Sequence, residues 1–166
     1  MIYKRICTAI AVAGTLDIAS ACLLTLAAGR SVTAMLAGIA AGPFGDRMLD
    51  AGPLAALCGL AVHYALIAVM VAAFAALASR SPTTRRHPVI AGIAYGLLIY
   101  GVMYWVVIPA RWPDANAVTS FRTVAIPIAI HITLVGLPIA LLVVGGKRDG
   151  KPVAATPGRQ AADKAN

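Results

Sequence analysis

The chain has 166 residues, of which 60% are hydrophobic and only 12% are charged, and its mean hydropathy is +0.85. Roughly a quarter of the residues in a soluble domain are charged, so this composition excludes an ordinary soluble globular domain. The formal net charge is +8, and the acidic residues are six Asp without any Glu. No basic face is interleaved with aromatic residues, which argues against nucleic acid as a partner.

Four long apolar stretches follow in chain order, at residues 6–29, 54–79, 88–110 and 123–145. A transmembrane helix needs about 20 apolar residues to cross a hydrocarbon core of roughly 30 Å, and each stretch has about that length. They predict an all-α, polytopic membrane protein: a four-helix transmembrane bundle within residues 1–146. Residues 147–166 combine Gly, Pro, Ala and charges without periodicity, which predicts a disordered, basic cytoplasmic tail.

The first stretch also has features of a secretory signal. A basic start precedes an apolar run, and the small residues 19–21 stand directly before Cys22. However, Asp17 interrupts the apolar run, and hydrophobicity continues to Gly29, beyond the usual length of a signal core. We therefore expect the first helix to be retained, with cleavage as the alternative.

The connection between the first two stretches contains a further apolar element. Residues 31–41 are too few to span a membrane and precede the breaker cluster at 42–45. They predict a short interfacial or re-entrant helix on the external side. This helix would act as a lid over an external opening, or it would simply cover the ends of the spanning helices. The short polar connection 80–87 predicts that the second and third helices are antiparallel neighbours.

The distribution of Lys and Arg predicts the orientation of the chain. Ten positive residues lie on one side of the four spans and four on the other. The positive-inside rule then predicts a protein of the bacterial inner (plasma) membrane with both termini in the cytoplasm. The ten are Lys4, Arg5, Arg80, Arg85, Arg86, Lys147, Arg148, Lys151, Arg159 and Lys164, and the four are Arg30, Arg47, Arg111 and Arg122.

Three ionisable residues lie deep inside the apolar stretches: Asp17, His63 and His131. At about 1.5 Å of rise per residue they all come near the middle of the membrane, together with Tyr100 on the third helix. Ionisable residues are costly inside a membrane and are functional candidates there. We expect these four residues to form a cluster that responds to protons or binds a small cation or solute. The alternative is a hydrogen-bonded polar cluster that only fixes which helices touch.

Two other interpretations of the same residues stay open. His63 and His131 have the residue type and depth of the axial ligands of a b-type haem, and with Asp17 they offer ligand types for a transition metal. Few aromatic residues are present to line a haem, and no metal-ligand spacing is found, so we expect no metal and no other cofactor. Catalytic signatures are also missing from the sequence, and we expect that the protein is not an enzyme.

Gly92 and Gly96 form a G-x-x-x-G pattern in the third stretch. Small residues at this spacing let helix backbones approach closely, which drives association within lipid. The pattern predicts a helix-packing face, either within one chain or in a homo-oligomer or a larger membrane complex. The lipid bilayer is the partner that the composition itself implies.

Several strings in order over about residues 8–145 resemble a family of small, uncharacterised four-helix bacterial inner-membrane proteins. The strings are Gly14-Thr15-Leu16-Asp17-Ile18, Leu57-Cys58-Gly59-Leu60-Ala61-Val62-His63-Tyr64, Arg86-His87-Pro88 with Gly92, Tyr95 and Gly96, and His131 with Gly136-Leu137-Pro138. More loosely, the chain is similar to the YagU-type inner-membrane proteins associated with acid tolerance. The resemblance implies the fold and the location, and a stress- or acid-related role. The alternatives are a structural accessory subunit of a larger membrane complex and a b-type haem electron-transfer protein.

Overall fold

The structure is a computed structural model that describes residues 2–113 and 121–145, and these ranges contain helices and turns but no strand. Four helices are long and apolar enough to cross a membrane: Ile2–Ala27, Gly52–Arg80, Pro88–Arg111 and Val124–Val144. Each agrees with a predicted stretch to within a few residues at either end. The all-α class and the four candidate spans are therefore confirmed, whereas the predicted tail at 147–166 lies outside the described residues.

The helical segments alternate between long spans and short connecting elements, with η1 a 3-10 helix and η2 and η3 π-helical. In chain order they are α1 (Ile2–Ala27), α2 (Val32–Phe44), η1 (Asp46–Asp50), α3 (Gly52–Arg80), α4 (Pro82–Arg86), α5 (Pro88–Val102), η2 (Met103–Val107), α6 (Ile108–Arg111), α7 (Phe121–Ile130), η3 (His131–Gly136) and α8 (Leu137–Val144).

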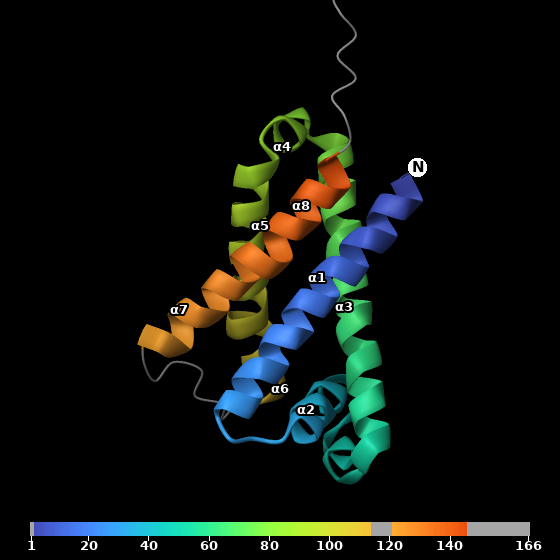
Figure 1. The fold of residues 1–166 in the computed structure, drawn as a ribbon, viewed down its shortest axis with the longest axis vertical. Coiled ribbons are helices and arrows are strands. Elements are labelled where there is room, and N and C mark those ends of the chain that lie inside the picture. Colours follow the sequence, from blue (N-terminus) through green and yellow to red (C-terminus); the bar gives the residue numbers. More distant parts are fainter. Residues whose placement is uncertain (1, 114–120, 146–166) are drawn as a thin grey trace, which may run out of the picture.

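The spans run back and forth, so that the connections gather at two ends of the molecule (Figure 1). The start of α1, the short α4 and the end of α8 lie at one end, and α2 and α6 lie at the other. Helix α8 packs against α1, α3 and α5, and α1 also packs along α3. The last span therefore lies between the first and the third.

Helix α2 packs on the first half of α3. Its buried face consists of Ala37, Ala40 and Ala41, and a Cβ at Gly59 of α3 would collide with the carbonyl oxygen of Leu36. The helix does not stop at the breaker cluster expected from the sequence, because Pro43 is accommodated inside its last turn. It ends at Gly45, whose φ of +85° suits glycine and turns the chain away.

Helix α5 packs on η3 and α8 through glycines. A Cβ at Gly96 would lie 2.5 Å from the carbonyl oxygen of His131, and one at Gly136 would collide with the carbonyl oxygen of Gly92. At such distances a side chain has no space, so only glycine allows this approach. The structure thus places Gly92 and Gly96 at a contact inside the chain.

Both π-helical segments end two residues before a proline. The N–H of Ile108 bonds to the carbonyl of Met103, and the N–H of Leu137 bonds to that of Ile132, five residues back in each case. Pro109 and Pro138 follow directly, and a proline ring collides with the carbonyl four residues earlier in a regular α-helix. The wider π turn accommodates that ring. Such π segments are frequent at functional sites.

The half of the molecule nearest the N-terminus has a solid core. Val71, Phe74 and Ile139 are fully buried there, between α1, α3, α5 and α8. The Tyr95 hydroxyl donates a hydrogen bond of 2.8 Å to the carbonyl of Met70, and its ring meets that of Phe74. Helices α3 and α5 are therefore antiparallel and in contact at this level, as the short connection predicts.

Candidate functional site

Asp17 and His63 lie together where α1 packs on α3. The Oδ2 atom of Asp17 is 3.9 Å from Nδ1 of His63, which is beyond direct hydrogen-bond distance. The other ring nitrogen, Nε2, lies 3.0 Å from the carbonyl oxygen of Gly14. Because a carbonyl only accepts, Nε2 must carry a hydrogen. In the neutral ring Nδ1 is then unprotonated, and its lone pair faces the carboxylate.

The His63 ring is held in place by its neighbours on both helices. A Cβ at Gly14 would lie 2.6 Å from Cε1 of Tyr64, so glycine is what lets the Tyr64 ring lie against α1. The Tyr64 hydroxyl and Oγ1 of Thr15 share a hydrogen bond of 2.8 Å. The rings of His63 and Tyr64 meet edge to face, with centroids 5.4 Å apart. No pattern in the sequence indicates this role of Gly14.

His131 begins the π-helical segment η3. Its Nδ1 lies 2.8 Å from the carbonyl oxygen of Pro127, so this nitrogen carries a hydrogen by the same argument. In the neutral ring Nε2 is therefore the acceptor. The ring meets those of Tyr100 and Tyr104 edge to face, each with centroids 6.1 Å away, and the two tyrosine rings stack on each other.

Two inner cavities bring the three deep ionisable side chains to one site. A cavity of about 60 Å³, with room for a few water molecules, is lined by Asp17, His63 and His131. A second cavity of about 260 Å³ is lined by the same three residues. Tyr104 also lines it, whereas Tyr100 is buried behind His131 and lines neither cavity. Depth alone suggested Tyr100, but the side chain that reaches the cavity comes from one turn further along.

A third and larger cavity lies on the side of α2 and α6. It has a volume of about 500 Å³, and its walls are almost entirely apolar. It shares four lining residues with the 260 Å³ cavity, so the two adjoin: Ile39, Leu66, Met103 and Ile108. Arg111 and Trp112 line it at the end of α6. A route of cavities thus leads from the α2–α6 end to the Asp17 carboxylate.

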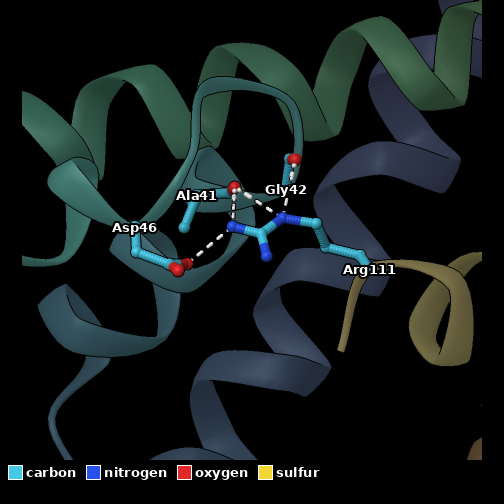
Figure 2. A network of polar contacts seen from close by, with 4 residues as sticks. All are labelled: Ala41, Gly42, Asp46 and Arg111. Atoms are coloured by element: carbon cyan, nitrogen blue, oxygen red, sulfur yellow. Dashed lines mark hydrogen bonds and ion pairs between the residues drawn. The ribbon is translucent and has the colours of Figure 1, made fainter. Parts of the chain in front are cut away.

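Arg111 ties α6 to the end of α2 (Figure 2). Its Nε and Nη2 donate to the carbonyl oxygen of Ala41 at 3.2 and 3.1 Å, and Nε also donates to that of Gly42 at 3.2 Å. Nη2 lies 2.5 Å from Oδ1 of Asp46. The carbonyls in the last turn of a helix lack intrahelical partners and carry partial negative charge, so a guanidinium satisfies both needs. From the sequence Arg111 counts only as a topological charge, and this contact was not expected.

The described residues offer no ready-made metal site: in 2–113 and 121–145, no three His, Cys, Asp or Glu side chains are grouped closely enough to hold one ion. Cys7, Cys22 and Cys58 are free thiols. No protein-family model, curated protein or solved structure matches the chain. The geometry of the Asp17 site is therefore the main indication of its function.

Proposed function

We propose that the chain is a multi-pass inner-membrane protein, folded as a four-helix bundle, whose Asp17, His63 and His131 form a site that responds to protons. The four apolar helices and the uneven distribution of Lys and Arg support this location. By the positive-inside rule, the end with α4 and the N-terminus faces the cytoplasm, and α2 lies at the external surface. A stress- or acid-related role agrees with proton uptake at this site.

The orientation of the His63 ring carries the proposal. Since Nε2–H is committed to the Gly14 carbonyl, the neutral ring turns a lone pair towards the Asp17 carboxylate 3.9 Å away. Two acceptors that face each other repel, whereas a proton on either of them, or a cation between them, makes the contact attractive. Histidine changes its charge near neutral pH, and small changes in its surroundings move that transition.

The other titratable groups around Asp17 are few. His131 approaches from η3 and Tyr104 from η2, and Tyr100 of α5 lies behind His131. Among the described residues, no Lys or Arg lines either inner cavity, and α2 contributes only Ile39. A proton or a bound cation is thus the charge that would balance the Asp17 carboxylate.

Proton uptake would act on helix packing through two contacts. The His63 ring bonds to the backbone of α1 at Gly14, the position that lets the Tyr64 ring lie against that helix. His131 stands at the start of a π-helical segment and bonds back to Pro127. A change in the charge of the His63 ring therefore alters a contact between two spans, and a change at His131 alters one within the last span.

The test is the thermal stability of the purified protein from pH 5 to pH 8. We expect the wild type to lose stability as pH rises, because deprotonation leaves the Asp17 carboxylate and Nδ1 of His63 as two facing acceptors in the folded protein. Asp17→Asn should flatten the profile, since its amide N–H can donate to Nδ1 of His63 without a proton. His63→Gln and His131→Gln should flatten it as well, with losses that do not add.

The matched controls are His87→Gln and Asp50→Asn, which alter exposed residues of the same types. Both should keep the wild-type profile. If the profiles of wild type and variants stay parallel and the losses add, the polar residues only fix the packing. The protein is then better described as a structural accessory subunit of a larger membrane complex.

A further inference from the structure

The Asp17 site presents an unusual set of hydrogen-bond acceptors when both histidines are neutral. The carboxylate of Asp17 and Nδ1 of His63 face each other. In the neutral His131 ring, Nδ1–H is bonded to the Pro127 carbonyl, so Nε2 carries no hydrogen and is an acceptor. All three side chains line the 260 Å³ cavity. The set therefore offers three acceptors and one negative charge.

A primary ammonium group is the chemical complement of such a set. It carries three N–H donors, no acceptor and one positive charge. It also bridges two acceptors that are 3.9 Å apart, the separation of Oδ2 and Nδ1, by donating one N–H to each. The ring of Tyr104 lines the same cavity, and aromatic faces attract cations.

The adjoining 500 Å³ cavity has the opposite character, because its lining is almost wholly apolar. Leu66 and Met103 line all three cavities and mark the junction between the polar and the apolar end. Ile67 and Ile99 line the 60 Å³ cavity and belong to the apolar core beside it. The space therefore has a narrow, charged end and an apolar, wider end.

Arg111 lies at the wide end, but its charge is already compensated. It contacts the Asp46 carboxylate and the carbonyl oxygens of Ala41 and Gly42. A cation that enters from this side therefore meets a paired guanidinium. We propose that the cavities bind a primary alkylammonium ion, with its head at Asp17 and its alkyl tail between α2, α3 and η2. This inference rests on the site of the proposed function, and the amine competes there with the proton.

The direct test is calorimetric titration of the full-length protein in detergent at pH 8 with n-hexylamine, 1-hexanol and tetraethylammonium. We expect saturable binding of hexylamine that weakens at least tenfold in Asp17→Asn and is unchanged in Asp50→Asn. Hexanol lacks the charge and tetraethylammonium lacks N–H donors, so each should bind at least tenfold more weakly. At pH 6, hexylamine should bind more weakly than at pH 8, because protons occupy the same acceptors.

A second variant separates the head from the tail. Leu66→Trp fills the junction of the cavities but leaves the three acceptors in place, and Leu66 is partly exposed, so a larger ring can be accommodated. It should abolish hexylamine binding and retain the weaker binding of methylamine. Loss of both amines in a variant that still melts cooperatively would overturn the placement of the tail.

Equal binding of hexylamine and hexanol would reduce the site to apolar partition and overturn the inference. Equal binding of tetraethylammonium, or full binding by Asp17→Asn, would also overturn it, because neither result needs the three acceptors. A pH-dependent melting profile without amine binding would contradict the proposed amine ligand but not the proposed proton response. Amine binding without a pH-dependent profile would contradict the proton response but not the amine ligand.

Discussion

His63 donates a hydrogen bond from Nε2 to the main-chain carbonyl oxygen of Gly14, over 3.0 Å, and thereby joins α3 to the backbone of α1. This single contact has two effects. It selects the ring nitrogen that is free to interact with Asp17, and it ties that ring to a position where only glycine leaves space for Tyr64. The chemistry of the site and the packing of the first two spans are therefore linked.

Gly14→Ala tests this link. The new Cβ would lie 2.6 Å from Cε1 of Tyr64, so the ring must shift and its bond to Thr15 must lengthen or break. Overpacking of this kind costs about 1–3 kcal/mol, which a thermal or denaturant unfolding experiment detects. Gly101→Ala is the control: it lies in a helix with nothing within 4 Å of the new Cβ. Removing a helical glycine there should stabilise the protein by about 0.5–1 kcal/mol.

The contact between the third and fourth spans should tolerate even less change. At Gly96 a Cβ would lie 2.5 Å from the carbonyl oxygen of His131, which is backbone and has no rotamer to move away. We expect Gly96→Ala to lower the free energy of unfolding by about 3 kcal/mol, the upper part of the range for overpacking. Gly101→Ala serves again as the control, now within the same helix. A loss for Gly96→Ala no larger than that of an exposed site would contradict the packing described for α5 and η3.

Arg111 and Asp46 should contribute very differently although they form an ion pair. Asp46 keeps 70% of its side chain exposed, and exposed ion pairs contribute at most about 1 kcal/mol. Asp46→Asn should therefore change stability by less than about 1 kcal/mol. Arg111→Gln also removes donors to the carbonyls of Ala41 and Gly42 and should cost about 1–2 kcal/mol, the lower part of the range for charged hydrogen bonds because the side chain is partly exposed.

The readout for this pair of variants is hydrogen exchange at the end of α2. In Arg111→Gln the last turn of α2 should exchange faster, while α3 stays protected. Equal effects of the two variants would mean that the ion pair, and not the capping of the carbonyls, holds α6 to α2.

The spans could be predicted from the sequence because a run of about 20 apolar residues is a local signal that needs no knowledge of neighbours. The depth of Asp17, His63 and His131 follows from the same count, and the structure does bring these three to common cavities. The choice of Tyr100 over Tyr104 shows the limit of that argument. Depth was read from distance along the helix, but rotation about its axis decides which side chain reaches a cavity, and only tertiary contacts fix that rotation.

The remaining features depend on contacts between segments far apart in the chain. Gly14 and Gly136 do not belong to a G-x-x-x-G pattern, yet each lies at a close approach that a Cβ would prevent. A proline such as Pro138 interrupts a regular α-helix. The structure shows instead that a π turn precedes it, as one precedes Pro109, so the helix continues through the proline. The width of a single turn leaves no periodic trace in the sequence.

Labelling of engineered cysteines tests whether the Asp17 cavity opens towards α2 and α6. Ser20 lines the 260 Å³ cavity, whereas Ala13, one turn before Asp17 on the same helix, is fully buried. The background protein has its three native cysteines, which are free thiols, replaced by alanine.

In intact cells, a small membrane-impermeant thiol reagent should modify Ser20→Cys and leave Ala13→Cys unmodified. A protein that retains only the exposed native Cys7, near the start of α1 and thus on the proposed cytoplasmic side, should react only in inverted vesicles. Modification of Ser20→Cys in inverted vesicles alone would reverse the orientation or close the proposed route, because the cavities would then be reached from the α4 end.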